Sequence, residues 1–399
     1  MPAHFVEPGL SGRISVASPR AAVHSPCMSG GAIIFEKAHV LCYRIFDIAD
    51  EIHLERARMR LSADTQRMRL RRAGSEYLQL PDPPITAELG RRGLPLRSGE
   101  VGVDALARVF SHGAASIILR VPVPEGTTLE ELVPLADELY DSQAVDALSL
   151  EIIQQLRKDL GDGLEGDHLW EQSESYTILF AEAIRGRPSA SELLERVDLA
   201  RLLLGERDET VLSPQERAEV LQTSFSYTAS DLAVIDWNGA FVYEPSGSMD
   251  IPDVLEIVNA QLLELRYYDE LLDRSIKGVY EGGLQSRGPA LVRILRSPYR
   301  RMARRVLATL LEMSEFIERV ENSLKIIGDF YLARVYEGAV RRLRIRQWQG
   351  AVTRKQQMLN QVYALLKGEV DIDRSLMLET MIVVLIVLEM LLALVRIGH

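Results

Sequence analysis

Apolar and polar positions in the first 245 residues follow short, changing patterns, and segments with strand-like alternation are separated by segments with helical spacing. Residues 40–48 alternate as a half-buried strand does, and residues 50–61 follow with helical spacing after a capping aspartate. Residues 68–80 are again strand-like and end at a group of prolines. The stretch 103–123 holds two strand candidates on either side of a His-Gly pair and predicts a hairpin, although its first half also fits a helix.

The same mixture continues to residue 245. Helices are predicted over 127–140, where the first turn is acidic, and from there to about residue 160. Further elements are expected in this order: a strand over 175–184, helices over 191–204 and 214–221, and a strand pair over 223–245 with its turn at Asp236-Trp237-Asn238-Gly239. Asn-Gly between β-rich segments is a strong hairpin signal. Strands and helices in this order predict an α+β fold, with a mixed α/β globular head over about 36–245.

After Asp250 the pattern changes to a heptad repeat. One set of apolar residues recurs every seven positions: Ile251, Val258, Leu265, Leu272 and Val279. A second set comprises Leu310, Met313, Ile317, Val320, Leu324, Ile327 and Tyr331. Because a Gly-rich stretch over 278–289 separates the sets, they predict a long antiparallel helical hairpin, a coiled-coil-like stalk over 250–368. A shorter helix over 352–367 and an acidic link are expected to lead into the final segment.

The final segment, Leu376 to Ile397, is almost entirely apolar and about 22 residues long. At about 1.5 Å per residue it is long enough to cross the hydrocarbon core of a bilayer. Its Ile, Leu and Val residues favour insertion by roughly 5 kcal/mol, against about 3 kcal/mol for the central carboxylate of Glu389. A buried core helix would show a polar face, which is missing between Met381 and Leu388. The sequence therefore predicts one C-terminal transmembrane helix over 374–397.

Two carboxylates accompany this apolar segment. Glu379 lies just ahead of its most apolar part, and Glu389 lies inside it. A carboxylate that faces lipid alone costs several kcal/mol, so both residues are predicted to lie in an intramembrane protein interface. With one span per chain, a second copy of the helix or a partner's helix would supply that interface, and we expect a homo-oligomer.

The two ends of the chain predict a topology. Residues 1–35 are rich in Pro, Ser, Gly and Ala and lack an apolar run of signal-peptide length, so we expect a disordered leader and a tail-anchored protein that starts at Met1 or Met28. Region 285–360 holds sixteen Lys or Arg against six Asp or Glu, although the net charge of the chain is −11. Basic residues beside a span mark its cytoplasmic side. The prediction is a single pass through the inner (cytoplasmic) membrane, with the head in the cytoplasm.

The basic region contains a dense arginine segment, RILRSPYRRMARR, at 293–305. Five of its arginines are candidates for contact with lipid headgroups or RNA phosphates: Arg296, Arg300, Arg301, Arg304 and Arg305. A solvated helix face explains the same arginines without any ligand, and that alternative stays open. Because the rest of the chain is acidic, membrane lipid is the expected partner and nucleic acid is not.

The composition excludes several classes of protein. A hydrophobic content of 47% excludes global disorder. Cys27 and Cys42 are the only cysteines, which excludes a disulfide framework and favours a reducing compartment. Together with seven scattered histidines, they give no zinc-ligand spacing.

Catalytic motifs are missing as well. The chain contains no G-x-x-x-x-G-K-[ST] loop, no H-E-x-x-H and no G-x-S-x-G. His168, close to Asp167 and Trp170 in a Gly-rich segment, is interpreted as a surface residue, and Asp236 with Asn238 as turn chemistry. We therefore expect no enzyme, no catalytic or metal-binding residues and no cofactor.

Three segments resemble the Rmd/YagE family, the "required for meiotic nuclear division" or sporulation-protein family. They are CYRIFDIADEIHLERARMRL at 42–61, the strand pair with its helix at 226–273, and MLETMIVVLIVLEMLLALV at 377–395. The first half of the chain is otherwise the least similar part, which suggests a divergent bacterial branch. The resemblance implies a membrane-tethered scaffold that assembles into large complexes, and it brings no catalytic residues.

The leading expectation is a non-enzymatic, tail-anchored membrane protein that acts as an oligomeric scaffold through partners that the sequence does not name. The alternative is a subunit of an ion-transport assembly akin to CorA-type magnesium channels, which also place an α/β head and long helices before C-terminal spans. That alternative lacks the Gly-Met-Asn signature, so a pore would need several chains around Glu389. A hydrolase or nucleotide-binding enzyme is a third hypothesis without a motif.

Overall fold

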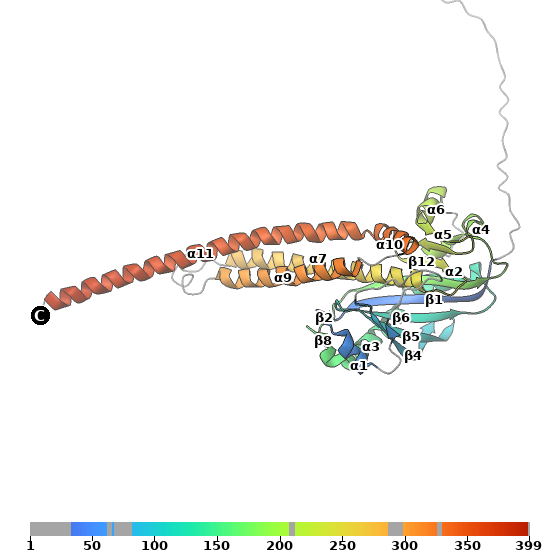
Figure 1. Ribbon diagram of the computed structural model, residues 1–399, viewed down its shortest axis with the longest axis horizontal. Helices are drawn as coiled ribbons and strands as arrows, with labels where there is room; N and C mark the ends of the chain where they lie inside the picture. Colours follow the sequence, from blue (N-terminus) through green and yellow to red (C-terminus); the bar gives the residue numbers. More distant parts are fainter. Residues whose placement is uncertain are drawn as a thin grey trace, which may run out of the picture. The chain divides into compact units, whose positions relative to one another are not determined.

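A large mixed β-sheet forms the centre of the head in the computed structural model (Figure 1). The structure describes residues 33–61, 66–67, 82–206, 212–285, 298–324 and 329–397. The strands in these residues are β1 (Ile34–Asp47), β2 (Glu51–Ile52), β3 (Gln66–Arg67), β4 (Ile85–Leu96), β5 (Gly99–Val109), β6 (Ala114–Val123), β7 (Thr127–Thr128), β8 (Leu164–Glu165), β9 (Ser173–Ile184), β10 (Ser224–Phe225), β11 (Leu232–Ile235) and β12 (Gly239–Tyr243). The helices are α1 (Leu54–Arg60), α2 (Leu129–Tyr140), α3 (Gln143–Leu160), α4 (Ala190–Arg196), α5 (Leu199–Leu204), α6 (Pro214–Leu221), α7 (Asp250–Gln285), α9 (Pro298–Leu324), α10 (Phe330–Arg342) and α11 (Ile345–Ile397), with a short 3₁₀ turn at Gly161–Gly163.

The strand order is β10-β11-β12-β9-β1-β6-β5-β4-β3, and β7 adds to one end of β1. Neighbouring strands are antiparallel except β12 and β9, which are parallel. β1 lies inside the sheet, where Cys42 pairs with Leu119 of β6 and Thr177 of β9. Both faces of β1 are covered from Val40 on, so that even Arg44 and Asp47 are buried where the alternation predicted a half-exposed strand. The mixed sheet with its helices confirms the predicted α+β class.

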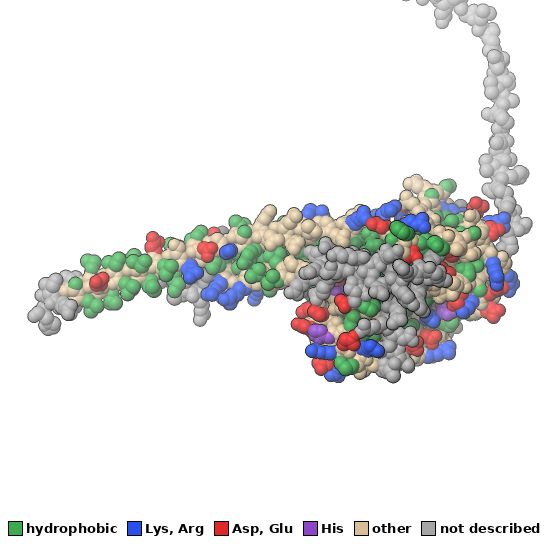
Figure 2. Space-filling model, viewed as in Figure 1, with side chains coloured by type: hydrophobic (Ala, Val, Ile, Leu, Met, Phe, Trp, Pro, Cys, Tyr) green, Lys and Arg blue, Asp and Glu red, His purple; other side chains and the backbone are tan. Residues whose placement is uncertain are grey.

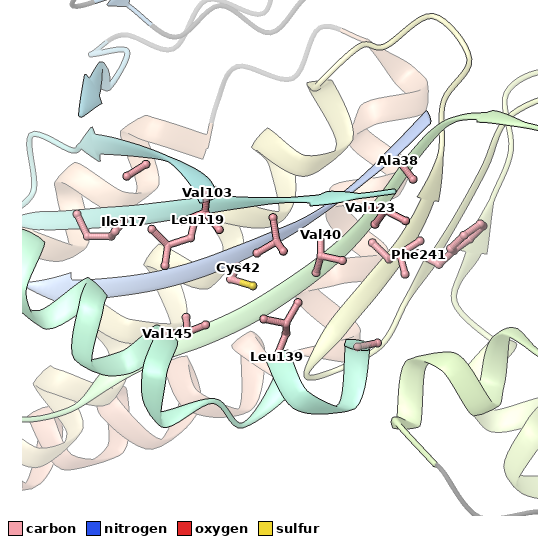
Figure 3. Close-up of a cluster of buried hydrophobic side chains, with 14 of the residues drawn as sticks. Ala38, Val40, Cys42, Val103, Ile117, Leu119, Val123, Leu139, Val145 and Phe241 are labelled. Carbon is pink, nitrogen blue, oxygen red and sulfur yellow. The ribbon is translucent and has the colours of Figure 1, made fainter. Parts of the chain in front are cut away.

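Helices α2, α3 and α5 cover one face of this sheet. Val40 and Cys42 of β1 lie in one buried cluster with Leu119 of β6, Leu139 of α2 and Val145 of α3 (Figure 3). Such clusters of fully buried aliphatic side chains are the main source of folding free energy. Burial raises the pKa of the Cys42 thiol to about 12, so this cysteine is an inert part of the core.

The first half of α7 covers the opposite face. Leu41 and Tyr43 of β1 and Ile178 of β9 are buried together with Val254 and Val258 of α7. From Val40 to Tyr43, odd-numbered residues of β1 therefore face α7 and even-numbered residues face α2 and α3, as the two-residue period of a strand requires. The helix that was expected to begin a separate stalk is thus part of the head over its first turns.

Beyond the sheet, α7, α9 and α11 pack side by side in the described residues (Figure 1). Ser275 Oγ of α7 lies 3.4 Å from Thr309 Oγ1 of α9, and Tyr336 of the following helix α10 donates to Gln261 of α7, so the chain runs back along α7. In α11, Lys355 Nζ lies 2.7 Å from a carboxylate oxygen of Asp269 and equally close to one of Asp273.

The expected two-helix hairpin is therefore wrong in one respect, because α11 joins it as a third helix. Heptad residues Leu272, Leu310 and Met313 share a buried cluster with Leu359 and Leu366 of α11. The apolar stripes of α7 and α9 are wider than a single coiled-coil seam needs, and a second neighbour covers the surplus. The side chains of Ile317, Val320 and Leu324, and the residue Ile327, lie outside the described residues.

The C-terminal helix is continuous where the sequence suggested a break. α11 runs from Ile345 through the acidic link at 368–373 into the apolar segment. The link contains no proline, and Gly368 alone costs a helix only about 1 kcal/mol. Its acidic residues Glu369 and Asp371 are exposed, so the helix does not need to bury them. The expected helix over 352–367 and the expected span are two parts of one helix.

Smaller differences concern helix starts and one strand. Asp50 caps no helix, because α1 starts at Leu54 after His53 and a short strand comes first. β4 was not predicted, since its glycines and adjacent arginines hide the alternation. The predicted helix over 191–204 is two helices, broken at Val197 and Asp198. β1 begins inside the predicted leader. Residues 1–32 of that leader and the predicted strand at 68–80 lie outside the described residues.

Candidate functional site

The apolar end of α11 is uncovered. It is long and apolar enough to cross a membrane, and none of that segment is buried against the rest of the described chain. Its side chains are exposed all round the helix, with Leu385 at 55% and the successive Ile386, Val387 and Leu388 close to it. A contiguous exposed apolar surface of this kind marks a site of contact with lipid or with another protein.

Both candidate intramembrane carboxylates lie on this uncovered helix. Glu379 and Glu389 are exposed, and neither forms an ion pair with a side chain in the described residues. They are ten positions apart, and at about 100° per residue they project about 80° from one another around the helix. A contact surface that runs straight along the helix would therefore include the two carboxylates only at its opposite edges.

Four of the five candidate arginines lie on the first turns of α9. All four of these residues are exposed: Arg300, Arg301, Arg304 and Arg305. The next residue, Val306, is buried in the helix bundle. Arg296 lies outside the described residues. The structure therefore brings four of the predicted residues together on one helix surface.

A pocket of about 750 Å³ opens between the first residues of β9 and the helices, and no motif in the sequence predicts it. The residues around it come from β9, α6, the β11–β12 turn, α7, α10 and α11, and include Glu174, Glu219, Trp237, Arg266, Arg342, Arg344 and Trp348. Charged side chains and two indoles dominate this lining.

Ion pairs hold the walls of the pocket in place. Arg342 of α10 donates from Nε to Asp236 Oδ1 at 2.8 Å and from Nη1 to Glu219 Oε1 at 2.8 Å. Arg266 of α7 pairs with Glu174 and donates to Gln172 Oε1 at 3.0 Å. Burial raises the pKa of the Glu174 carboxyl, and the charge of Arg266 partly opposes that shift. The arginines of α7 and α10 thus tie these helices to the sheet.

The turn at Asp236 does more than reverse the chain. Asp236 is buried, pairs with Arg342, and accepts the backbone N–H of Trp237 at 2.8 Å. Tyr176 of β9 donates its hydroxyl to the carbonyl of Asp236 at 2.9 Å. Trp237 is left 63% exposed at the pocket mouth. The expectation of turn chemistry alone was therefore incomplete, because nothing local to the turn indicates the distant Arg342.

A second group of charges is buried between α7 and the sheet. Arg108 of β5 donates to Asp253 Oδ1 at 2.8 Å and also pairs with Glu256, and all three side chains are almost fully buried. Burial raises the pKa of Glu256 to about 7, although the nearby charge of Arg108 lowers it. A buried ion pair of this kind adds little net stability, but the loss of one partner leaves a buried charge unpaired.

His168 is tied to the fold and is not the simple surface residue that was expected. Its Nε2 lies 3.2 Å from Asp47 Oδ1 at the end of β1, and its ring stacks on Tyr267 of α7 at 5.6 Å. Burial lowers the pKa of His168, but the hydrogen bond and charge of Asp47 outweigh it and raise the pKa to about 9. Trp170 is buried beside the same tyrosine and donates to Glu270.

These sites are built mainly from arginines, carboxylates and aromatic rings. In the described residues, no group of three or more His, Cys, Asp or Glu side chains is placed to hold a metal ion. The pocket offers arginines and indoles, which bind anionic or planar groups.

The fold and these groups define an α+β protein whose C-terminal helices end in an uncovered apolar segment. The chain belongs to the family described as "Uncharacterized protein MJ0711, N-terminal domain", whose model matches residues 37–250. It is 26% identical over 271 residues to the uncharacterized protein MJ0711 of Methanocaldococcus jannaschii, which covers 67% of this chain and 76% of the archaeal protein. No solved structure matches the chain. The matching family model does not carry the Rmd/YagE name, so membership of the Rmd/YagE family is not confirmed.

Proposed function

We propose that this protein is a non-enzymatic scaffold anchored in a membrane by the apolar end of α11, with its head held away from the bilayer. The observation that carries the proposal is the apolar segment itself, which is long enough to span and has no cover within the described chain. Lipid covers all sides of a helix at once, and this segment is apolar on all sides.

The helices support a spacer role. From Ile345 to Leu376, α11 rises about 47 Å at about 1.5 Å per residue before its apolar segment begins. Packing against α7 and α9 as far as Leu366, together with the bridge from Lys355 to Asp269 and Asp273, stiffens the first two thirds of this length. A stiff spacer presents the sheet and its pocket to partners at a fixed distance from the membrane.

The resemblance to the Rmd/YagE proteins supports the same proposal, since a membrane-tethered scaffold of large complexes is what that resemblance implies. The absence of a catalytic motif in the sequence and the binding character of the pocket agree with a scaffold.

Membrane fractionation tests the anchor. The full chain should stay in the membrane pellet after a high-salt wash, and a chain ending at Asp371 should move to the soluble fraction. Full-length Glu379→Gln is the matched control, because it changes the same segment without shortening it and should stay in the pellet. A truncated chain that still pellets after the wash would refute a single anchor.

The orientation is part of the proposal. The basic excess before the apolar segment supports a head on the cytoplasmic face of the inner membrane. Protease added to intact spheroplasts should then leave the head uncut and digest it only after lysis. Digestion of the head without lysis would show the opposite orientation and would not contradict the proposed anchor.

An ion-transport subunit remains the second candidate function. The observation that favours it is the continuity of α11, which would transmit movement of the head directly to Glu389 in the membrane. Ion flux into proteoliposomes that contain the full chain, abolished in Glu389→Leu, would replace the scaffold proposal by this one.

A further inference from the structure

The first turns of α9 carry a compact cationic surface. Arg300, Arg301, Arg304 and Arg305 occupy positions i, i+1, i+4 and i+5, which lie on one side of a helix. All four are exposed, and none forms an ion pair with an acidic side chain in the part of the chain that the structure describes. We call these four residues the arginine face.

The packing register puts the arginine face at the end of the bundle nearest the apolar segment. Thr309 lies beside Ser275, and Lys355 lies between Asp269 and Asp273, so Thr309 is level with about residue 359 of α11. Because α9 runs antiparallel to α11, Arg305 and Arg300 are level with about residues 363 and 368.

That position brings the arginines close to a bilayer that holds the apolar segment. From residue 368 to Leu376 the helix rises only about 12 Å. The headgroup layer occupies about 5–8 Å outside the hydrocarbon core, and charges act over about 8–10 Å at physiological salt. Figure 2 shows Lys and Arg side chains gathered on one side of the bundle, next to the exposed hydrophobic surface.

The surrounding charges leave the arginine face positive. Exposed bases at the same end of the bundle are Lys277, Lys367 and Arg374, and exposed acids are Glu281, Glu369 and Asp371. Lys277 and Glu281 lie 3.9 Å apart and offset each other. The four arginines are therefore the surplus charge in this part of the described chain.

We propose that the arginine face binds the headgroups of anionic phospholipids. This inference rests on the proposed function, since it needs α11 in the membrane. Lipid is favoured over RNA because the face is level with a part of α11 only about 12 Å of helix from the apolar segment. In addition, Tyr299, the aromatic residue of the arginine segment, is half-buried against the bundle core, which leaves less of its ring for stacking on bases. Tyr280, exposed near the same end of α7, is of a type enriched at membrane interfaces.

The test compares full-length proteins in phosphatidylcholine vesicles with and without phosphatidylglycerol. The variant R300Q/R301Q/R304Q/R305Q removes the arginine face. The control R58Q/R91Q/R92Q/R97Q removes the same number of exposed arginines from the head. A third protein with lysine at the four α9 positions keeps the charge and should behave as the wild type. Equal thermal unfolding of all four proteins verifies that each is folded.

The readout is energy transfer from a donor dye on the bundle to headgroup-labelled phosphatidylglycerol, together with recovery of each protein in the vesicle fraction. Each arginine near an anionic surface raises the preference for anionic lipid roughly fivefold. The glutamine variant should therefore lose most of the phosphatidylglycerol enrichment that the control keeps. Equal enrichment in the two variants, with both in the vesicles, would overturn the inference and leave the proposed function intact.

Two other outcomes also decide the matter. If the wild type itself does not enter vesicles, the proposed function fails, and the inference fails with it. If a single-stranded RNA binds the wild type and not the glutamine variant while phosphatidylglycerol enrichment is unchanged, the arginine face is a nucleic-acid site and the inference is wrong.

Discussion

Glu256 in α7 and Glu389 in α11 each stand within an apolar stretch of a long helix, but their surroundings differ. Glu256 is fully buried against the sheet, where Arg108 pairs with it from β5. Glu389 lies on a helix that the described chain leaves uncovered, and it has no charged partner there. In α7, the sheet that covers the apolar side of the helix also supplies the counter-charge for Glu256, which is Arg108. The prediction for Glu389 is accordingly that its partner, if it stays charged in a membrane, comes from another helix.

The most direct way to break this comparison is to place the same charge in both helices. Leu255 of α7 is fully buried, so Leu255→Asp should cost more than about 4 kcal/mol through lost packing and an unpaired buried charge. Leu385 is 55% exposed, so Leu385→Asp should leave the thermal unfolding of the detergent-solubilised protein unchanged.

The two variants should separate again in the membrane. Leu385→Asp adds about 3 kcal/mol to an insertion free energy that is favourable by only about 2 kcal/mol, so its membrane fraction should fall sharply. Equal unfolding midpoints for the two variants in detergent would mean that the end of α11 is covered by protein in the folded state.

The counter-charge at Glu256 can be removed by Arg108→Met. This change leaves Asp253 and Glu256 buried without their cation and should destabilise the head by about 3–5 kcal/mol. Adding Asp253→Asn and Glu256→Gln should restore much of the loss, because no unpaired charge then remains buried. Chemical denaturation of the three proteins measures both effects. A triple variant no more stable than Arg108→Met would show that Arg108 acts through packing and not through charge.

Much of the fold could be predicted from local patterns, because each signal lies within a few residues. The alternation in β1, the Asn-Gly turn before β12 and the helix that begins at Asp250 are of this kind. β4 was missed because glycines and arginines interrupt its alternation. The third helix of the bundle was missed because a heptad pattern predicts that a helix packs against others, but not how many helices pack together.

The candidate site was less predictable, since its residues meet only through long-range packing. Asp236 and Arg342 are 106 positions apart, and nothing near either residue indicates the other. His168 and Asp47 are separated by 121 positions in the same way. The arginines of the arginine face could be predicted from the arginine-rich sequence at 293–305. Their distance from the apolar segment, however, follows only from the register of α9 against α11.

Glu389→Leu sharpens the comparison at the membrane. Removing a carboxylate from the apolar segment saves about 3 kcal/mol of insertion free energy, so membrane recovery should rise. If Glu389 finds its partner in another copy of this helix, the same change should weaken self-association. Crosslinking in native membranes, wild type against variant, measures the second effect, with Glu379→Leu as the control at the segment's edge. Identical oligomer ladders, or monomers in both cases, would remove any role for Glu389 in assembly.

The smallest effect concerns His168, which joins the sheet to α7 through Asp47 and Tyr267. Its pKa is raised to about 9 in the folded protein, above the ordinary value of about 6.5, because Asp47 outweighs the effect of burial. The stabilisation is therefore complete below about pH 6.5 and is lost as the pH rises through about 9. Since the ring is partly exposed, it amounts to about 1–2 kcal/mol.

Unfolding free energies at about pH 6 and about pH 10 test this link. The wild type should lose about 1–2 kcal/mol more than His168→Gln between the two values, because the glutamine cannot carry the charge that Asp47 attracts. Asp47→Asn removes the same attraction from the other side and should flatten the pH dependence equally. A His168→Gln protein that keeps the full wild-type pH dependence would show that another group titrates in this range, and that the contact between His168 and Asp47 does not set the alkaline stability of the head.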